Sequence, residues 1–183
     1  RNIKLTIQYD GTAYHGWQTQ KNVRTVQETA EKAIAVITGA KPQLTGCSRT
    51  DTGVHAEMFA ANFKSETKIP CEKFPLALNT YLPDDIVCIK AEDMPADFNA
   101  RFCAKGKKYT YYIQNSRFPD VFEKNYAWHY PYKLDIDEMK RAAAAFLGEH
   151  DFIGFAASGF TVKTTVRTIY SLDVEKTGDK IKI

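Results

Sequence analysis

IKLTIQYDG, at residues 3–11, alternates apolar side chains from Ile3 to Tyr9 with polar ones between them. A period of two predicts a β-strand with one buried face. The pair Asp10-Gly11 then predicts a turn at the end of that strand. The remaining elements are predicted outward from this strand.

A helix is predicted next along the chain. Thr25 has the side chain of an N-cap, and Glu28 follows it at the spacing of a capping box. Apolar residues then recur at helical spacing from Val26 until Gly39, which marks the end of the helix. This helix should pack on the first strand.

The rest of the first half supplies two more strands, a second helix and a fourth strand. The strands are expected at residues 44–49 and 55–64, around a turn at Thr52-Gly53. A helix near residues 72–81 is closed by Pro83, and a strand follows at residues 86–91. The predicted order is β-α-β-β-α-β, with Asp51 on a loop between two strands.

The second half starts with a tyrosine-rich strand predicted at residues 107–114. Asp135 caps a helix expected to reach residue 147, and a strand is expected at residues 166–175. Gly178-Asp179 predicts a turn, after which the chain stops four residues into a returning strand, with an unpaired edge. We therefore expect a chain truncated at its C-terminus.

The composition is that of an ordinary folded protein, with 44% hydrophobic and 26% charged residues in a chain of 183. No apolar run approaches the roughly 18 residues that span a bilayer, and the N-terminus lacks the pattern of a signal peptide. We expect a water-soluble, cytoplasmic protein. The four cysteines are widely spaced without a CxxC pair, which argues against a zinc site and against a disulfide framework.

The charge distribution permits a nucleic-acid partner. The net charge is +3, and Arg101, Lys105, Lys107 and Lys108 crowd just before an aromatic run. Lysine and arginine at such a density suit contacts to RNA phosphates, although solvated surface charge is the alternative for each. The tyrosines that follow, beginning at Tyr109, can pack a sheet or stack on RNA bases.

The loop CSRTDTGVHA, residues 47–56, gathers a cation, a carboxylate and an imidazole at Arg49, Asp51 and His55. Such loops often carry active sites. On residue types alone, Asp51 and Gly53 favour an Asx-type turn in which the carboxylate accepts backbone N–H groups. Cys47 with His55 also permits a cysteine nucleophile, and Asp51, His55 and Glu57 a metal site, although neither has a full set of partners.

This loop resembles the motif of the tRNA pseudouridine synthase A family, Gly/Cys-x-Arg-Thr-Asp-x-Gly-Val-His-Ala. Other blocks resemble the same family in the same order, and the resemblance covers essentially all of the chain. These blocks are YDGT at 9–12, GWQTQ at 16–20, TVQ at 25–27, LN at 78–79, LPDDI at 82–86, FNAR at 98–101, KYTY at 108–111 and HDF at 150–152.

The resemblance implies an α+β pseudouridine synthase fold, with a mixed, mainly antiparallel sheet built from two RRM-like halves and helices on its outer faces. Those halves would be residues 1–104, with the Asp51 loop, and residues 105–183, incomplete. It further implies a homodimer that isomerises uridines 38–40 of the tRNA anticodon stem-loop to pseudouridine, without metal or organic cofactor. An RNA-binding RRM-like module without catalysis is the alternative.

Site residues follow from the matched motifs. Asp51 would be the catalytic carboxylate, Arg49 would replace the flipped base or bind its phosphate, and Tyr109 would stack on the uracil and assist proton removal at C5. The candidates for phosphate contacts are Arg24, Arg101, Lys107 and Lys108. The family also pairs an arginine with its aspartate in a later block; Arg167 does not match it, so the resemblance places that arginine after Ile183.

Overall fold

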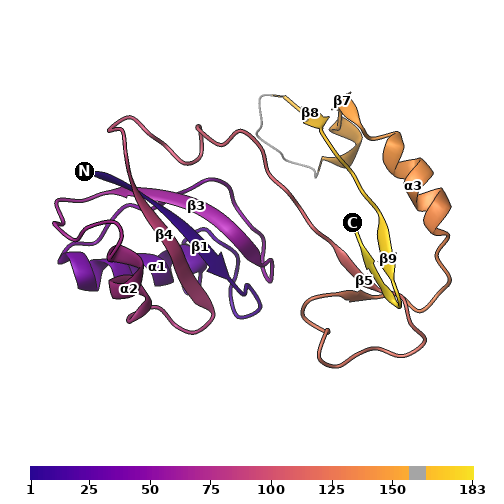
Figure 1. Ribbon diagram of the computed structural model, residues 1–183, viewed down its shortest axis with the longest axis horizontal. Helices are drawn as coiled ribbons and strands as arrows, with labels where there is room; N and C mark the ends of the chain where they lie inside the picture. Colours follow the sequence, from indigo (N-terminus) through magenta and orange to yellow (C-terminus); the bar gives the residue numbers. More distant parts are fainter. Residues whose placement is uncertain (157–163) are drawn as a thin grey trace. The chain divides into compact units, whose positions relative to one another are not determined.

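The computed structural model describes residues 1–156 and 164–183. They form two compact units, Arg1–Lys107 and Lys108–Ile183, shown in Figure 1. Each unit has its own hydrophobic core. In the described part of the chain, no helix is long and apolar enough to cross a membrane.

The first unit is a four-stranded antiparallel sheet with two helices. Its strands are β1 (Asn2–Tyr9), β2 (Thr45–Gly46), β3 (Ala56–Lys64) and β4 (Ile86–Met94), in the order β2-β3-β1-β4. Helices α1 (Val26–Thr38) and α2 (Phe74–Asn79) cover one face of this sheet (Figure 1). The predicted order β-α-β-β-α-β is confirmed.

Strand β1 is the centre of the first core. It pairs with β3 on one side and β4 on the other, both antiparallel. Ile3, Leu5 and Ile7 are completely buried beneath the two helices, as the alternation of apolar and polar residues predicted.

Helix α1 begins and ends at the predicted residues. The Thr25 hydroxyl accepts the N–H of Glu28 at 3.4 Å, and Gly39 closes the helix with φ +77°. Glu28 carries an ion pair to Lys32 on the next turn. Local sequence signals are therefore sufficient for this helix.

Strand β2 is shorter than predicted, because its backbone changes partners early. The N–H of Cys47 still reaches Ala60 of β3, at 2.8 Å. Three residues later, the Thr50 carbonyl instead accepts the N–H of Trp17, at 3.1 Å. The chain thus leaves the sheet to form the Asp51 loop.

The second unit contains a mixed sheet and a small two-stranded one. The first has the order β6 (Trp128–His129), β5 (Tyr112–Gln114), β10 (Lys180–Lys182) and β9 (Glu175–Thr177). Only the β5–β6 pair is parallel. The second sheet joins β7 (Gly148–Asp151) and β8 (Val166–Ile169), and α3 spans Ile136–Ala144. A short 3₁₀ turn spans Ile153–Phe155. The chain is therefore α+β with mostly antiparallel sheets.

Three predictions for the second unit need correction. The strand expected at residues 107–114 is confined to β5, and the strand expected at 166–175 is divided between β8 and β9, which pair in different sheets. The predicted unpaired edge is wrong. Strand β10 lies between β5 and β9, and its Ile181 is completely buried opposite Ile113.

Helix α3 confirms its predicted N-cap. The Asp135 carboxylate accepts the N–H groups of Asp137 and Glu138, both at 3.0 Å. These bonds, chiefly the one from Glu138, lower the pKa of Asp135. The helix ends at Ala144, earlier than expected, and Gly148 opens β7 with φ +94°.

The core of the first unit predicts a stability effect. Leu5→Ala should lower the free energy of unfolding by about 2–5 kcal/mol, because it leaves a cavity at a fully buried position. Denaturant unfolding of the protein measures this. Met58→Ala, at a position that is 79% exposed, is the control and should change stability little. Equal losses in both variants would contradict the assignment of β1 as the core strand.

Candidate active site

The Asp51 loop is a tight turn made by backbone atoms. The N–H of Val54 donates to the carbonyl of Asp51 at 3.2 Å, and Gly53 takes φ +78°, which a side chain would strain. The carboxylate of Asp51 accepts no hydrogen bond from the described residues, so the predicted turn forms without the Asx-type bond. Turn formation therefore leaves the carboxylate available.

Hydrogen bonds to two buried tyrosines, Tyr9 and Tyr14, hold this loop in place. The hydroxyls of Tyr9 and Thr50 lie 2.9 Å apart, and the N–H of Gly53 donates to the Tyr14 carbonyl at 3.2 Å. Burial raises the pKa of Tyr9 to about 12, so its phenol stays neutral at pH 7. The loop is consequently tied to the end of β1 and to the segment that follows it.

Two glycines in that segment permit close backbone contact with the loop. A Cβ at Gly11 would lie 2.0 Å from the carbonyl oxygen of Val54, and one at Gly16 would lie 2.3 Å from that of Thr50. Gly16 also has φ +77°. Neither position accommodates a side chain unless the Asp51 loop moves.

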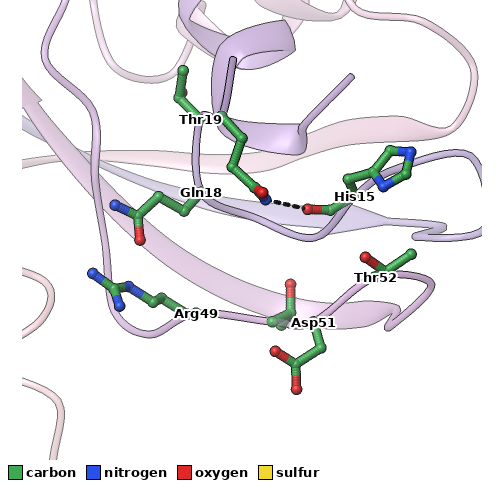
Figure 2. A pocket seen from close by; sticks show the side chains of 8 residues that line it. His15, Gln18, Thr19, Arg49, Asp51 and Thr52 are labelled. Atoms are coloured by element: carbon green, nitrogen blue, oxygen red, sulfur yellow. Dashed lines mark hydrogen bonds between the residues drawn. The ribbon is translucent and has the colours of Figure 1, made fainter. Parts of the chain in front are cut away.

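The two segments line an open pocket of about 280 Å³ (Figure 2). His15, Gln18, Thr19 and Gln20 form one wall, and the other wall is residues 49–52. The sequence predicted Arg49 and Asp51 as neighbours at a site, and both line this pocket. The opposite wall was not predicted; its only signal was the block at 16–20 within the family resemblance.

The carboxylate of Asp51 and the guanidinium of Arg49 are both available to a ligand. Both side chains are exposed, and neither makes a hydrogen bond or ion pair with any residue in the described ranges. In Figure 2 the dashed line ends on His15, and none ends on Arg49 or Asp51. The pocket thus offers an anionic oxygen acceptor and a planar array of donors to a ligand.

The comparison with protein families identifies the family of the chain. A family model described as tRNA pseudouridine synthase matches residues 5–103 and 142–183, and so includes the whole Asp51 loop. The chain belongs to the tRNA pseudouridine synthase family. It is a family of isomerases, and the resemblance drawn from the motifs is confirmed.

Individual relatives agree. The chain is 53% identical over 183 residues to a tRNA pseudouridine synthase A of Thermoanaerobacter sp. strain X514, covering all of this chain and 75% of that protein. It is 52% identical over 181 residues to one from Acetivibrio thermocellus and 50% identical over 181 residues to one from Clostridium acetobutylicum. Each of these matches covers 99% of this chain and 74% of the relative.

Arg24 is already engaged within the first unit. Its guanidinium stacks 4.4 Å from the centre of the Tyr14 ring, donates to the Tyr14 hydroxyl at 2.8 Å and pairs with Asp85 at 3.4 Å. Tyr14 in turn donates to Asp85 through a short hydrogen bond. Burial, followed by this bond, raises the pKa of Tyr14. Arg24 therefore fixes the segment after β1, although its side chain remains 47% exposed.

The remaining predicted residues are not among the eight that line the pocket. Arg101, Lys107 and Lys108 are exposed. Tyr109 belongs to the second unit, precedes β5 and is 65% exposed, so the alternative of sheet packing is wrong for this residue.

The structure also places the residues of the cysteine-nucleophile and metal-site alternatives. Among the described residues, the only side-chain hydrogen-bond partner of Cys47 is Ser48, with 4.0 Å between their Sγ and Oγ atoms. Nδ1 of His55 lies 3.0 Å from Asp10 and 3.1 Å from the N–H of Gly11. No group of three or more His, Cys, Asp or Glu side chains within the described ranges is arranged to hold a metal ion.

The close glycine contact predicts a functional effect. Gly11→Ala should displace the Asp51 loop, because the new methyl group meets a backbone carbonyl that cannot rotate away. We expect pseudouridine formation in tRNA to fall by at least about tenfold. Gly106→Ala, where a Cβ meets nothing within 4 Å, is the control. Full activity in Gly11→Ala would contradict the rigid placement of the loop.

Proposed function

We propose that this chain isomerises uridine to pseudouridine at positions 38–40 of tRNA, with Asp51 as the reacting carboxylate. The names of its relatives support the reaction and the substrate class. The observation that carries the assignment to Asp51 is its free carboxylate, which lines the pocket and has no partner among the described residues.

The reaction suits a carboxylate. The N1–C1′ bond of uridine breaks, the uracil turns, C5 bonds to C1′, and the C5 proton leaves while N1 gains one. An ionised Asp51 can act as a nucleophile at uracil C6 or ribose C1′, or as a base at the sugar. Water must be kept from the detached base throughout, so the bound RNA has to close the exposed side of the pocket.

The target nucleotide must leave its stack before it reaches Asp51. Such flipping costs roughly a few kcal/mol, which contacts to the flipped state have to offset. We propose that Arg49 stabilises the flipped nucleotide, because its five N–H donors can hold a phosphate or take the place of the base. Tyr109 is proposed to stack on the uracil and assist removal of the C5 proton, and its exposed ring supports that role.

Phosphate contacts are assigned to Arg101, Lys107 and Lys108, because all three are exposed cations close together in sequence. Arg24 is assigned a phosphate contact through the exposed part of its side chain, while it keeps its pair with Asp85. These contacts position the RNA and carry no sequence information.

We further propose that the chain comprises two RRM-like halves of the pseudouridine synthase fold, residues 1–104 and 105–183. The antiparallel order β2-β3-β1-β4 with both helices on one face supports this for the first half. The assembly proposed from the family is a cytoplasmic homodimer that uses no cofactor.

Substitution of Asp51 tests the catalytic role. With tRNA labelled with tritium at uridine C5, Asp51→Asn should abolish tritium release, because the amide is neither nucleophile nor base. Binding of tRNA should persist. Asp97→Asn, at an exposed position outside the pocket, is the matched control and should leave release unchanged.

Unchanged tritium release in Asp51→Asn would contradict the assignment of Asp51 as the reacting carboxylate. Tight tRNA binding by the unmodified protein without any release would instead favour the alternative of an RNA-binding module without catalysis.

Salt dependence tests the phosphate contacts. Replacing Lys107 and Lys108 together by Ala should weaken tRNA binding, because fewer counterions are released. The slope of log K against log salt should become shallower by about 0.7–0.9 for each lysine–phosphate pair removed. Filter binding over a salt series measures the slope. Lys32→Ala is the control, since that lysine pairs with Glu28 on α1. An unaltered slope in the double variant would show that Lys107 and Lys108 do not contact RNA phosphates.

A further inference from the structure

Gln20 lines the pocket with an amide that a hydrogen bond to the backbone holds in one orientation. Its Nε2 donates to the backbone carbonyl of His15 at 2.9 Å, the bond drawn as a dashed line at His15 in Figure 2. A carbonyl oxygen can only accept, so the NH₂ group must face His15. The Oε1 atom is thereby fixed as the free acceptor.

The carbonyl that anchors Gln20 is itself well supported. The N–H of His15 donates to the Arg24 carbonyl at 2.9 Å, and the N–H of Thr19 donates to the Gln27 side chain at 3.1 Å. Trp17, between them, is buried. Rotating the amide by 180° would bring Oε1 against the His15 carbonyl oxygen, so the pocket presents an acceptor of defined position and a second N–H beside it.

We propose that Gln20 is a specificity residue that reads the target base by accepting a hydrogen bond from uracil N3–H. This inference rests on the proposed function. Uracil carries a proton at N3 with carbonyl oxygens on both sides, which complements an amide acceptor with an adjacent N–H. Cytosine has an unprotonated N3, which would set two acceptors against each other.

The geometry of the isomerisation also favours N3–H as the group that Gln20 binds. N1 and C5 of uracil are both bonded to C6, so a half-turn about the axis from C6 to N3 exchanges them. The same half-turn exchanges the two carbonyl groups but leaves N3–H in place. A hydrogen bond from N3–H to Oε1 of Gln20 can therefore persist while the detached base turns, and the remaining N–H of Gln20 meets one carbonyl before the turn and the other after it.

The test combines a variant with a modified base in full-length protein. Anticodon stem-loop RNA is prepared with uridine or 3-methyluridine at the target position, and pseudouridine or its 3-methyl counterpart is quantified for wild type and Gln20→Ala. Wild type should lose about 5- to 150-fold in kcat/KM on 3-methyluridine, and Gln20→Ala should lose a similar factor on uridine. In Gln20→Ala the methyl group should add no more than about a twofold loss.

If the loss caused by Gln20→Ala and the loss caused by the methyl group simply multiplied, the proposal would be overturned. A kcat/KM within about twofold of wild type for Gln20→Ala on uridine would also overturn it. Gln20→Leu keeps the side-chain volume and should behave like Gln20→Ala. Gln43→Ala replaces an exposed glutamine outside the pocket and is the control. Dissociation constants for both RNAs in the Asp51→Asn background give the same cycle without turnover, so failure of the Asp51 assignment is distinguishable from failure of this one.

Discussion

Carbonyl oxygens on the Asp51 loop lie against Gly11 and Gly16, in space that any side chain at either position would occupy. The glycines lie in the segment that follows β1, a central strand of the first sheet, on either side of the buried Tyr14. The loop cannot shift without disturbing that strand or the aromatic residues beside it. The pocket is therefore positioned by the core of the unit, and the Asp51 loop needs no side-chain contacts of its own carboxylate to keep its place.

Sequence patterns predicted the elements whose signals are local. Alternation predicted β1, and Thr25 with Gly39 bounded α1, because capping depends on neighbours in the chain. Pairings between distant segments were not predictable in this way. Strand β10 pairs with β5, some 68 residues earlier at Ile181 and Ile113, and no local pattern encodes that register. The wall at residues 15–20 was missed for the same reason, since it becomes a wall only through backbone contacts to Thr50.

The two initial interpretations of Asp51 turned out to be compatible. On residue types the aspartate favoured a turn, and the family motif favoured a catalyst. The structure builds the turn from the Asp51 carbonyl, the Val54 N–H and the positive φ of Gly53. The side chain takes no part in these contacts. A residue can thus form a turn with its backbone while its carboxylate stays free for chemistry, which residue statistics alone do not separate.

The pocket combines free and fixed polar groups, and the proposed reaction gives each kind a purpose. Arg49 and Asp51 have no partners among the described residues, so they can reorganise as the base leaves and returns. Gln20 is anchored on the His15 carbonyl, so its acceptor keeps one direction. A base that turns about its C6–N3 axis changes every neighbour except those on the axis. A fixed acceptor on that axis retains the detached base without opposing its rotation. A contact to either carbonyl group alone would be broken by the rotation.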